Sequence, residues 1–116
     1  MKKYFLVAVA GSCALILANC GSSKKAMAAP APKLTYETSV STVIMSNCTP
    51  CHVPSKGGNK RPYDNFANVK QDIDEIIRRV ELHPGERGFM PFRGSRLSDS
   101  TIAVFKQWKA DGMLEK

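Results

Sequence analysis

Two thiols and an imidazole lie within five consecutive residues near the middle of the chain. Cys48 and Cys51 are separated by Thr49 and Pro50, and His52 follows directly. This spacing lets two thiols add to the two vinyl groups of a haem while the adjacent imidazole reaches the iron. The Cys-x-x-Cys-His element therefore predicts one covalently attached haem c, with His52 as the proximal axial ligand.

Two other roles for the same residues stay open on the sequence alone. A thioredoxin-like redox pair would need a strand before Cys48 and a βαβ pattern around it, and neither is visible. A zinc site would need two ligands besides Cys48 and Cys51, and the two histidines are His52, which abuts Cys51, and His83. Haem attachment fits the pattern better than either.

The opposite face of the iron needs its own ligand. Met90 lies in a glycine- and proline-rich loop with few core residues, and its soft thioether suits haem iron. His83 would give two imidazole ligands, but it also fits the role of a cation at a helix C-terminus. Met45 stands three residues before Cys48, and Met113 follows the last predicted helix. We therefore predict Met90 as the distal axial ligand.

Three helices are predicted to position these residues. The first begins near Thr35, although several of its residues are β-branched and favour strand. The second is capped by Asp64 or Asn65, and the third begins after Ser98 and ends at Gly112. The apolar residues at helical spacing are Tyr36, Val40, Val43 and Ile44; Phe66, Val69, Ile73, Ile76, Ile77 and Val80; and Ile102, Phe105 and Trp108.

Two long loops separate the predicted helices. Residues 52–63 are predicted to contain no regular structure, and residues 83–96 are rich in glycine and proline. Three helices offer little mutual packing surface, whereas ordering each residue costs about 1–2 kcal/mol in backbone entropy. A buried planar cofactor would supply the missing core.

The N-terminus has the pattern of an export signal. Lys2 and Lys3 precede an uncharged, apolar run over residues 4–18. That run is short for a membrane-spanning helix, which needs about 20 apolar residues. We predict that residues 1–19 direct export to the periplasmic side of a bacterial membrane.

The end of this run resembles the lipobox of bacterial lipoproteins. It reads Leu17-Ala18-Asn19-Cys20, and the resemblance implies that Cys20 becomes the lipid-modified first residue of the mature protein. Asn19 replaces the usual small residue, so ordinary signal cleavage stays an alternative. Residues 20–34 lack an apolar period and are rich in Gly, Ser, Lys, Ala and Pro. They predict a flexible tether between the membrane and a domain at 35–116.

The charge distribution argues against a nucleic-acid partner. The chain has a formal net charge of +7, but five of its 17 Lys and Arg residues precede Leu34. From Leu34 to Lys116 there are 12 basic and 10 acidic residues. Two haem propionates would bring the net charge of this part of the chain close to zero. A balanced domain of this kind lacks the concentrated positive field that nucleic acids attract.

Three stretches of the chain, in this order, resemble the monohaem class I cytochrome c family. They are Cys48–His52, Gly88–Phe92 with its Met-Pro pair, and Leu97–Gly112, which opens with Leu-Ser-Asp and contains Trp108. The resemblance covers about Thr35 to Met113. It implies an all-α, small cytochrome c fold in which three main helices and long loops wrap around one covalently bound haem. It also implies that the first and last helices cross and that His52 and Met90 are the axial ligands.

The resemblance further implies single-electron transfer between redox-partner proteins of a respiratory chain, with no substrate turnover. The alternative is a haem enzyme or sensor whose distal site is open, which would require Met90 to be absent from the iron or displaceable. Because free thiols outside the cytoplasm tend to oxidise, attachment also implies a cytochrome c maturation machinery that keeps both cysteines reduced.

Basic residues in the two loops are predicted to steer acidic redox partners, with ordinary solvation as the alternative. These residues are Lys56, Lys60, Arg61, Arg87, Arg93 and Arg96.

Overall fold

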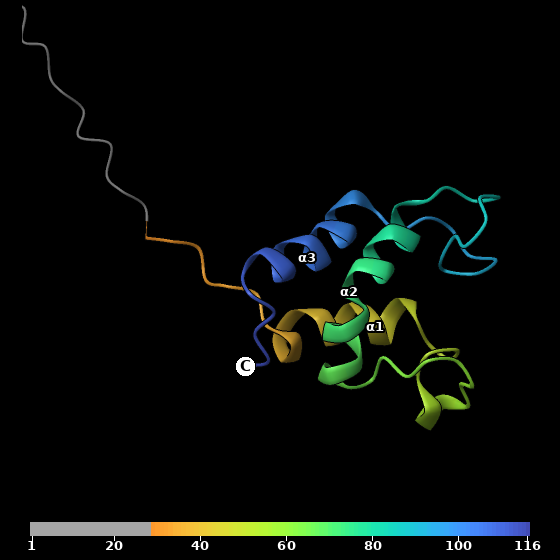
Figure 1. Cartoon of the computed structure of the whole chain (residues 1–116), viewed down its shortest axis with the longest axis horizontal. Coiled ribbons are helices and arrows are strands. Elements are labelled where there is room, and N and C mark those ends of the chain that lie inside the picture. The colour runs from red at the N-terminus through yellow and green to blue at the C-terminus, as the bar shows by residue number, and fades with distance from the viewer. Residues whose placement is uncertain (1–28) are drawn as a thin grey trace, which may run out of the picture. The chain divides into compact units, whose positions relative to one another are not determined.

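The computed structural model describes residues 29–116, and this part of the chain contains helices and no strand (Figure 1). The all-α prediction is therefore confirmed for the described part. The predicted export signal, Cys20 and most of the predicted tether lie outside it. The elements are the π-helical turn η1 (Tyr36–Val40), α1 (Ser41–Asn47), the 3₁₀ turn η2 (Pro54–Lys56), α2 (Phe66–Glu81) and α3 (Asp99–Ala110).

Side-chain caps fix the starts of the three main helical segments. The Thr35 hydroxyl accepts from the Thr38 N–H ahead of η1, which runs into α1 without a break. The Asn65 side chain accepts from the N–H of Asn68, and the Ser98 hydroxyl accepts from that of Thr101. Each cap satisfies a backbone donor that has no partner within its helix. The three helices predicted from apolar spacing are confirmed.

The loop over residues 52–63 differs from the prediction that it contains no regular structure. It includes the single 3₁₀ turn η2, which begins with Pro54. Proline suits the first position of a helical turn, because its φ is already helical and no N–H is needed there. Gly57 ends the turn with a left-handed φ of 87° while its N–H donates to the Pro54 carbonyl at 2.9 Å.

The core is formed where α3 packs on both η1 and α2. Trp108 is fully buried and lies 6.4 Å from the ring of Tyr36 and 6.2 Å from that of Phe66. Its indole N–H donates to the Leu114 carbonyl at 2.8 Å, and an isolated parallel bridge pairs Thr35 with Leu114. The beginning of the first helical segment is thus joined to the end of the last.

The two long loops leave α1 and α2 on the same side of the helices, the yellow-green and cyan segments at the right of Figure 1. Val53 anchors the first loop and is fully buried, whereas Phe89 and Leu97 anchor the second and are 8% exposed. No helix in the described part of the chain is long and apolar enough to cross a membrane.

Candidate functional site

A cavity of about 770 Å³ lies between the two long loops and α2. Its wall includes residues 48–52 from the end of α1 and residues 90–92 from the second loop. The apolar side chains of Ile76, Val80 and Leu97 also line it. The volume falls within the range of about 300–1,000 Å³ that is usual for small-molecule and cofactor sites. The structure thus brings Cys48–His52 and Met90 together around one space.

The other candidate ligands lie elsewhere. Met45, His83 and Met113 are not among the residues that line the cavity. Met45 is 43% exposed on α1, and His83 is exposed beyond the end of α2. Met90, in contrast, is half-buried at the cavity wall.

The two thiols differ in their surroundings. Cys48 is half-buried and Cys51 is exposed, and both are free. Burial raises the pKa of the Cys48 thiol to about 11, because a thiolate loses hydration there. The segment before them, residues 36–47, is helical, so the strand that a thioredoxin-like pair would need is replaced by a helix. Within residues 29–116, no three Cys, His, Asp or Glu side chains are grouped as metal ligands.

The His52 ring is held in a defined orientation. Its Nδ1 lies 2.7 Å from the carbonyl oxygen of Arg61. Because a carbonyl only accepts, the neutral imidazole must carry its proton on Nδ1 to make this bond. Nε2 then keeps a free lone pair, which is the form of histidine that binds a metal ion. The phenol ring of Tyr63 stacks on the imidazole, with centroids 4.6 Å apart and planes 8° apart.

The loop after η2 packs directly on the Cys-x-x-Cys-His backbone. The N–H of Lys60 donates to the Cys51 carbonyl at 3.0 Å, and the N–H of Tyr63 donates to the His52 carbonyl at 2.8 Å. A Cβ atom at Gly58 would lie 2.2 Å from the Pro50 carbonyl oxygen. Only glycine therefore allows the loop to approach this closely.

The segment that carries Met90 is attached to the other end of α2. The Met90 N–H donates to the Arg79 carbonyl at 3.2 Å, and the N–H of Phe89 donates to the Glu86 carbonyl at 3.1 Å. Gly88 has a left-handed φ of 95° and lies within the turn that the bond between Phe89 and Glu86 closes. The backbone at Met90 is thus fixed by the last turns of α2, and the buried ring of Phe89 anchors it further.

Charged side chains line one part of the cavity wall. Arg61 donates to the Asp72 carboxylate at 2.8 Å, and Arg79 donates to the Glu75 carboxylate at 2.6 Å. Lys60 also lines the wall and has no ion-pair partner in the described part. Three bases and two acids leave this part of the wall with one excess positive charge, which favours an anionic group.

These residues fit a covalently attached haem. The wall offers two thiols, an imidazole whose Nε2 is free, a thioether, apolar side chains and one excess positive charge that favours carboxylates. The Thr49 hydroxyl is buried at the same wall and has no hydrogen-bond partner among the described residues. A buried hydroxyl in this state costs about 1–3 kcal/mol, so the wall also has a polar atom left to satisfy.

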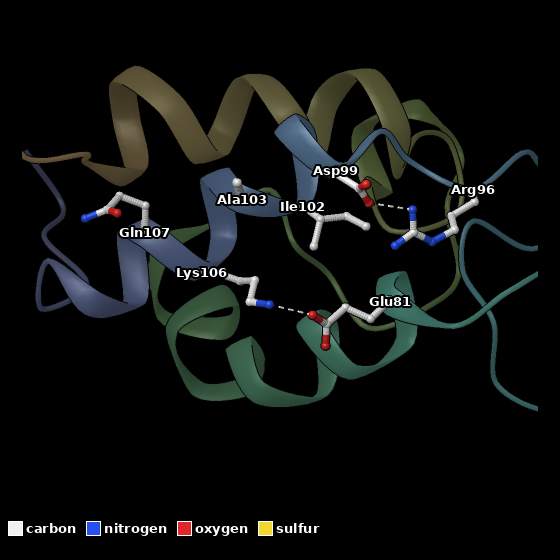
Figure 2. Close-up of a pocket in the computed structure, with 7 residues that line it drawn as sticks. All are labelled: Glu81, Arg96, Asp99, Ile102, Ala103, Lys106 and Gln107. Carbon is white, nitrogen blue, oxygen red and sulfur yellow. Dashed lines mark hydrogen bonds and ion pairs between the residues drawn. The ribbon is translucent and has the colours of Figure 1, made fainter.

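A second hollow of about 450 Å³ lies where α2 faces α3, and Figure 2 shows the residues that line it. Its charges are already paired. Lys106 contacts Glu81 at 2.7 Å and thereby links the two helices, and Arg96 contacts Asp99 at 2.7 Å. None of the predicted haem-site residues lines this hollow.

The amino-acid sequence had not identified Gly58, Tyr63, Asp72, Glu75 or Arg79 as part of the site. Gly58 and Tyr63 lie in the predicted loop over residues 52–63, and the other three lie on α2. Their contribution depends on how the first loop folds back on residues 48–52, for which the sequence carries no local signal. Comparison of the chain with protein-family models, with curated proteins and with solved structures finds no match.

Proposed function

We propose that this chain is a monohaem c-type cytochrome that carries single electrons between redox-partner proteins and turns over no substrate. One observation carries the proposal: Cys48, Cys51, His52 and Met90 line the same cavity, and the hydrogen bond at His52 Nδ1 leaves Nε2 free. When bound, haem supplies a reversible one-electron change at its iron.

The chain's own residues would have distinct tasks. Cys48 and Cys51 would hold the haem by thioether bonds, and His52 and Met90 would supply Nε2 and the thioether sulfur as axial ligands. The apolar part of the wall would exclude water from the ring. A thioether favours the ferrous state more than a second imidazole does. This preference suits a protein that accepts electrons from respiratory donors and passes them to oxidases or reductases.

Charge at the outer surface supports a steering role for some of the predicted bases. Arg61 and Arg96 are already paired with Asp72 and Asp99. The other four, Lys56, Lys60, Arg87 and Arg93, form no ion pair within the described residues. The ring of Phe92, which is 68% exposed, lies at the cavity beside Arg93. An apolar side chain next to unpaired bases suits brief contact with an acidic partner.

The proposal includes export and a membrane anchor. Residues 1–19 would direct the chain to the periplasmic side of a bacterial membrane, and lipid on Cys20 would tether the domain there. Each buried CH₂ of an acyl chain contributes about 0.8 kcal/mol, so two or more chains suffice for stable anchoring. The mass of the mature N-terminal peptide tests the anchor, because an unmodified Cys20 would exclude lipidation while leaving export by ordinary signal cleavage possible.

The haem proposal is tested by expressing the exported chain together with a cytochrome c maturation system. We expect haem that remains attached to the denatured polypeptide, and a weak ferric absorption band at the red end of the spectrum that reports methionine ligation. Met90→Ala should lose that band, whereas Met45→Ala, a change outside the cavity, should keep it.

Three results would overturn parts of this assignment. A chain that attaches no haem would exclude the cytochrome proposal. Survival of the red band in Met90→Ala would exclude Met90 as the ligand. Rapid carbon monoxide binding to the reduced wild type would indicate an open distal site and would favour an enzyme or a sensor.

A further inference from the structure

The imidazole of His52 is held by a short segment of chain, and Tyr63 is the part of that segment that lies flat on the ring. We propose that Tyr63 is a positioning residue that fixes the plane of the His52 imidazole and thereby sets the reduction potential of the site. This inference rests on the proposed function and adds a residue to it. It is carried by the ring stack, by the place of Tyr63 at the cavity wall and by the contacts that hold the segment.

The aromatic contacts separate Tyr63 from the core. Tyr36, Phe66 and Trp108 contact one another as rings within the helical core. Within the described residues, the ring that stacks on Tyr63 is the imidazole of His52. The two ring centroids lie 4.6 Å apart, and the two ring planes differ by 8°. A parallel arrangement this close covers one face of the imidazole.

Two contacts on His52 are complementary. The bond from Nδ1 to the Arg61 carbonyl fixes the tautomer and the direction of the Nδ1–H vector. Rotation of the ring about that vector would leave the hydrogen bond intact but would change the tilt of the plane. The flat face of Tyr63 opposes this rotation, because any tilt of the imidazole would drive its edge into the phenol ring.

The backbone at Tyr63 is fixed by two hydrogen bonds, and Arg61 ties the segment before it to α2. The Tyr63 N–H donates to the His52 carbonyl at 2.8 Å, and the Tyr63 carbonyl accepts from the Tyr36 hydroxyl at 3.3 Å. Two residues earlier, the Arg61 guanidinium donates to Asp72 and to Gln71 on α2, each at 2.8 Å. The stacking ring is therefore part of an ordered segment tied to both the first helical segment and α2.

The stack has two consequences for a bound haem. A fixed imidazole plane would give His52 one orientation toward a bound iron, and the environment of a metal-binding histidine tunes the metal. The half-buried phenol ring also covers part of the proximal wall. Water admitted there would stabilise the more highly charged ferric state, so removal of the ring should lower the potential.

The experiment compares holoproteins that differ only at this position. Tyr63→Phe keeps the ring and removes the hydroxyl, and it should retain the wild-type potential. Tyr63→Leu removes the stack and should shift the ferric–ferrous equilibrium toward ferric at least threefold, which is about 28 mV for one electron. The ferric electron paramagnetic resonance spectrum, which depends on imidazole orientation, should change in the leucine variant only.

Phe66→Leu is the matched control, because it also removes a half-buried ring but from the helical core and away from the cavity. It should lower thermal stability and leave the potential and the resonance spectrum unchanged. If Tyr63→Leu fails to retain haem, Tyr63→Met fills similar volume without a ring and is judged by the same criteria.

An unchanged potential and spectrum in the ring-free variant would overturn the inference while leaving the proposed cytochrome function intact. An equal shift in Tyr63→Phe would also overturn it, because the hydroxyl rather than the stack would then be responsible. Absence of covalent haem from the wild type would exclude the proposed function and this inference together.

Discussion

At the scale of single residues, the site depends on how closely the first loop approaches the Cys-x-x-Cys-His backbone. Gly58 is the point of closest approach, since a Cβ atom there would lie 2.2 Å from the carbonyl oxygen of Pro50 and 2.6 Å from that of Cys51. Both contacts are to backbone atoms, which cannot rotate away as a side chain would. The loop that positions Tyr63 and the Arg61 carbonyl would have to move as a whole.

We therefore expect Gly58→Ala to destabilise the domain. Overpacking of this kind typically costs about 1–3 kcal/mol, and denaturant unfolding of the holoprotein measures it. The yield of covalently attached haem should fall as well, because the displaced loop no longer holds His52. The matched control is Gly57→Ala, at a position with a left-handed φ of 87° and open space around the added atom.

The control variant should suffer backbone strain of about 1–2 kcal/mol but attach haem as the wild type does. The two glycines are adjacent in the chain, so the comparison separates a clash at the site from a local conformational cost. Equal haem yields in the two alanine variants would contradict the role assigned to Gly58.

At the scale of elements, α2 links the two ligand segments. In its first half, Asp72 and Gln71 hold Arg61, whose carbonyl orients His52. Near its end, the Arg79 carbonyl accepts from the N–H of Met90. One rigid helix thus determines where the proximal and distal segments lie relative to each other.

The ion pairs on α2 provide a pH-dependent test. Hydrogen bonds from the Arg78 and Arg79 guanidinium groups lower the pKa of the Glu75 carboxyl to about 2, from a usual value of 4.5. A carboxyl that binds its proton less readily in the folded chain stabilises the fold above the unfolded pKa and loses that contribution as the pH falls. The stabilisation by Glu75 should therefore be complete above about pH 5 and disappear between pH 4.5 and 2.

Glu75→Gln removes this titration. The variant should melt at a slightly lower temperature than the wild type at pH 7, because the group is exposed and solvent screens its pairs. The difference between the two melting temperatures should shrink as the pH falls from 4.5 toward 2. Thermal melts followed by circular dichroism measure this difference, and a gap that widens in acid would contradict the assignment.

The helices could be predicted from the sequence, whereas the turn η2 and the contact of Tyr63 with His52 could not. Helix positions followed from local information: apolar residues at helical spacing, and the caps at Asn65 and Ser98. The turn η2 was missed because glycines and prolines across the loop indicated irregular structure, whereas only Pro54 indicated a helical start. The placement of Tyr63 on His52 depends on a chain reversal between them, and neither residue carries a local signal of that contact.

At the scale of the whole molecule, charge is distributed unevenly between the helices and the loops. On the helices most bases are paired with acids, as in Lys106 with Glu81 and Lys109 with Asp74. In the two loops that border the cavity, four bases have no ion pair within the described residues. A nearly neutral domain would therefore present most of its unpaired bases on the loops that border the proposed haem site, with Lys70 on α2 as an exception.

This distribution predicts opposite salt effects for small redox reagents of opposite charge. Electron transfer from the reduced protein to an anionic oxidant such as ferricyanide should slow as ionic strength rises, whereas transfer to a cationic cobalt complex should accelerate. The Debye length shortens from about 30 Å at 0.01 M salt to about 10 Å at 0.1 M. Steering by a charged patch changes association rates by about 10-fold or more. Stopped-flow absorbance gives both rate constants.

Charge reversal locates the responsible residues. The double variant Lys60→Glu with Arg93→Glu changes one unpaired base in each loop, Lys60 at the cavity wall and Arg93 over the ring of Phe92 at that wall, and should lower the ferricyanide rate and its salt dependence. Lys70→Glu is the control, because Lys70 also lacks an ion pair in the described part but lies on α2 over the ring of Phe66, 5.2 Å from its centroid. Since electron transfer needs approach to the haem edge, a base that does not line the cavity, such as Lys70, affects the encounter less than one at the cavity wall. Equal effects per charge from helix and loop would mean that only net charge matters, and the loops would then have no special part in partner binding.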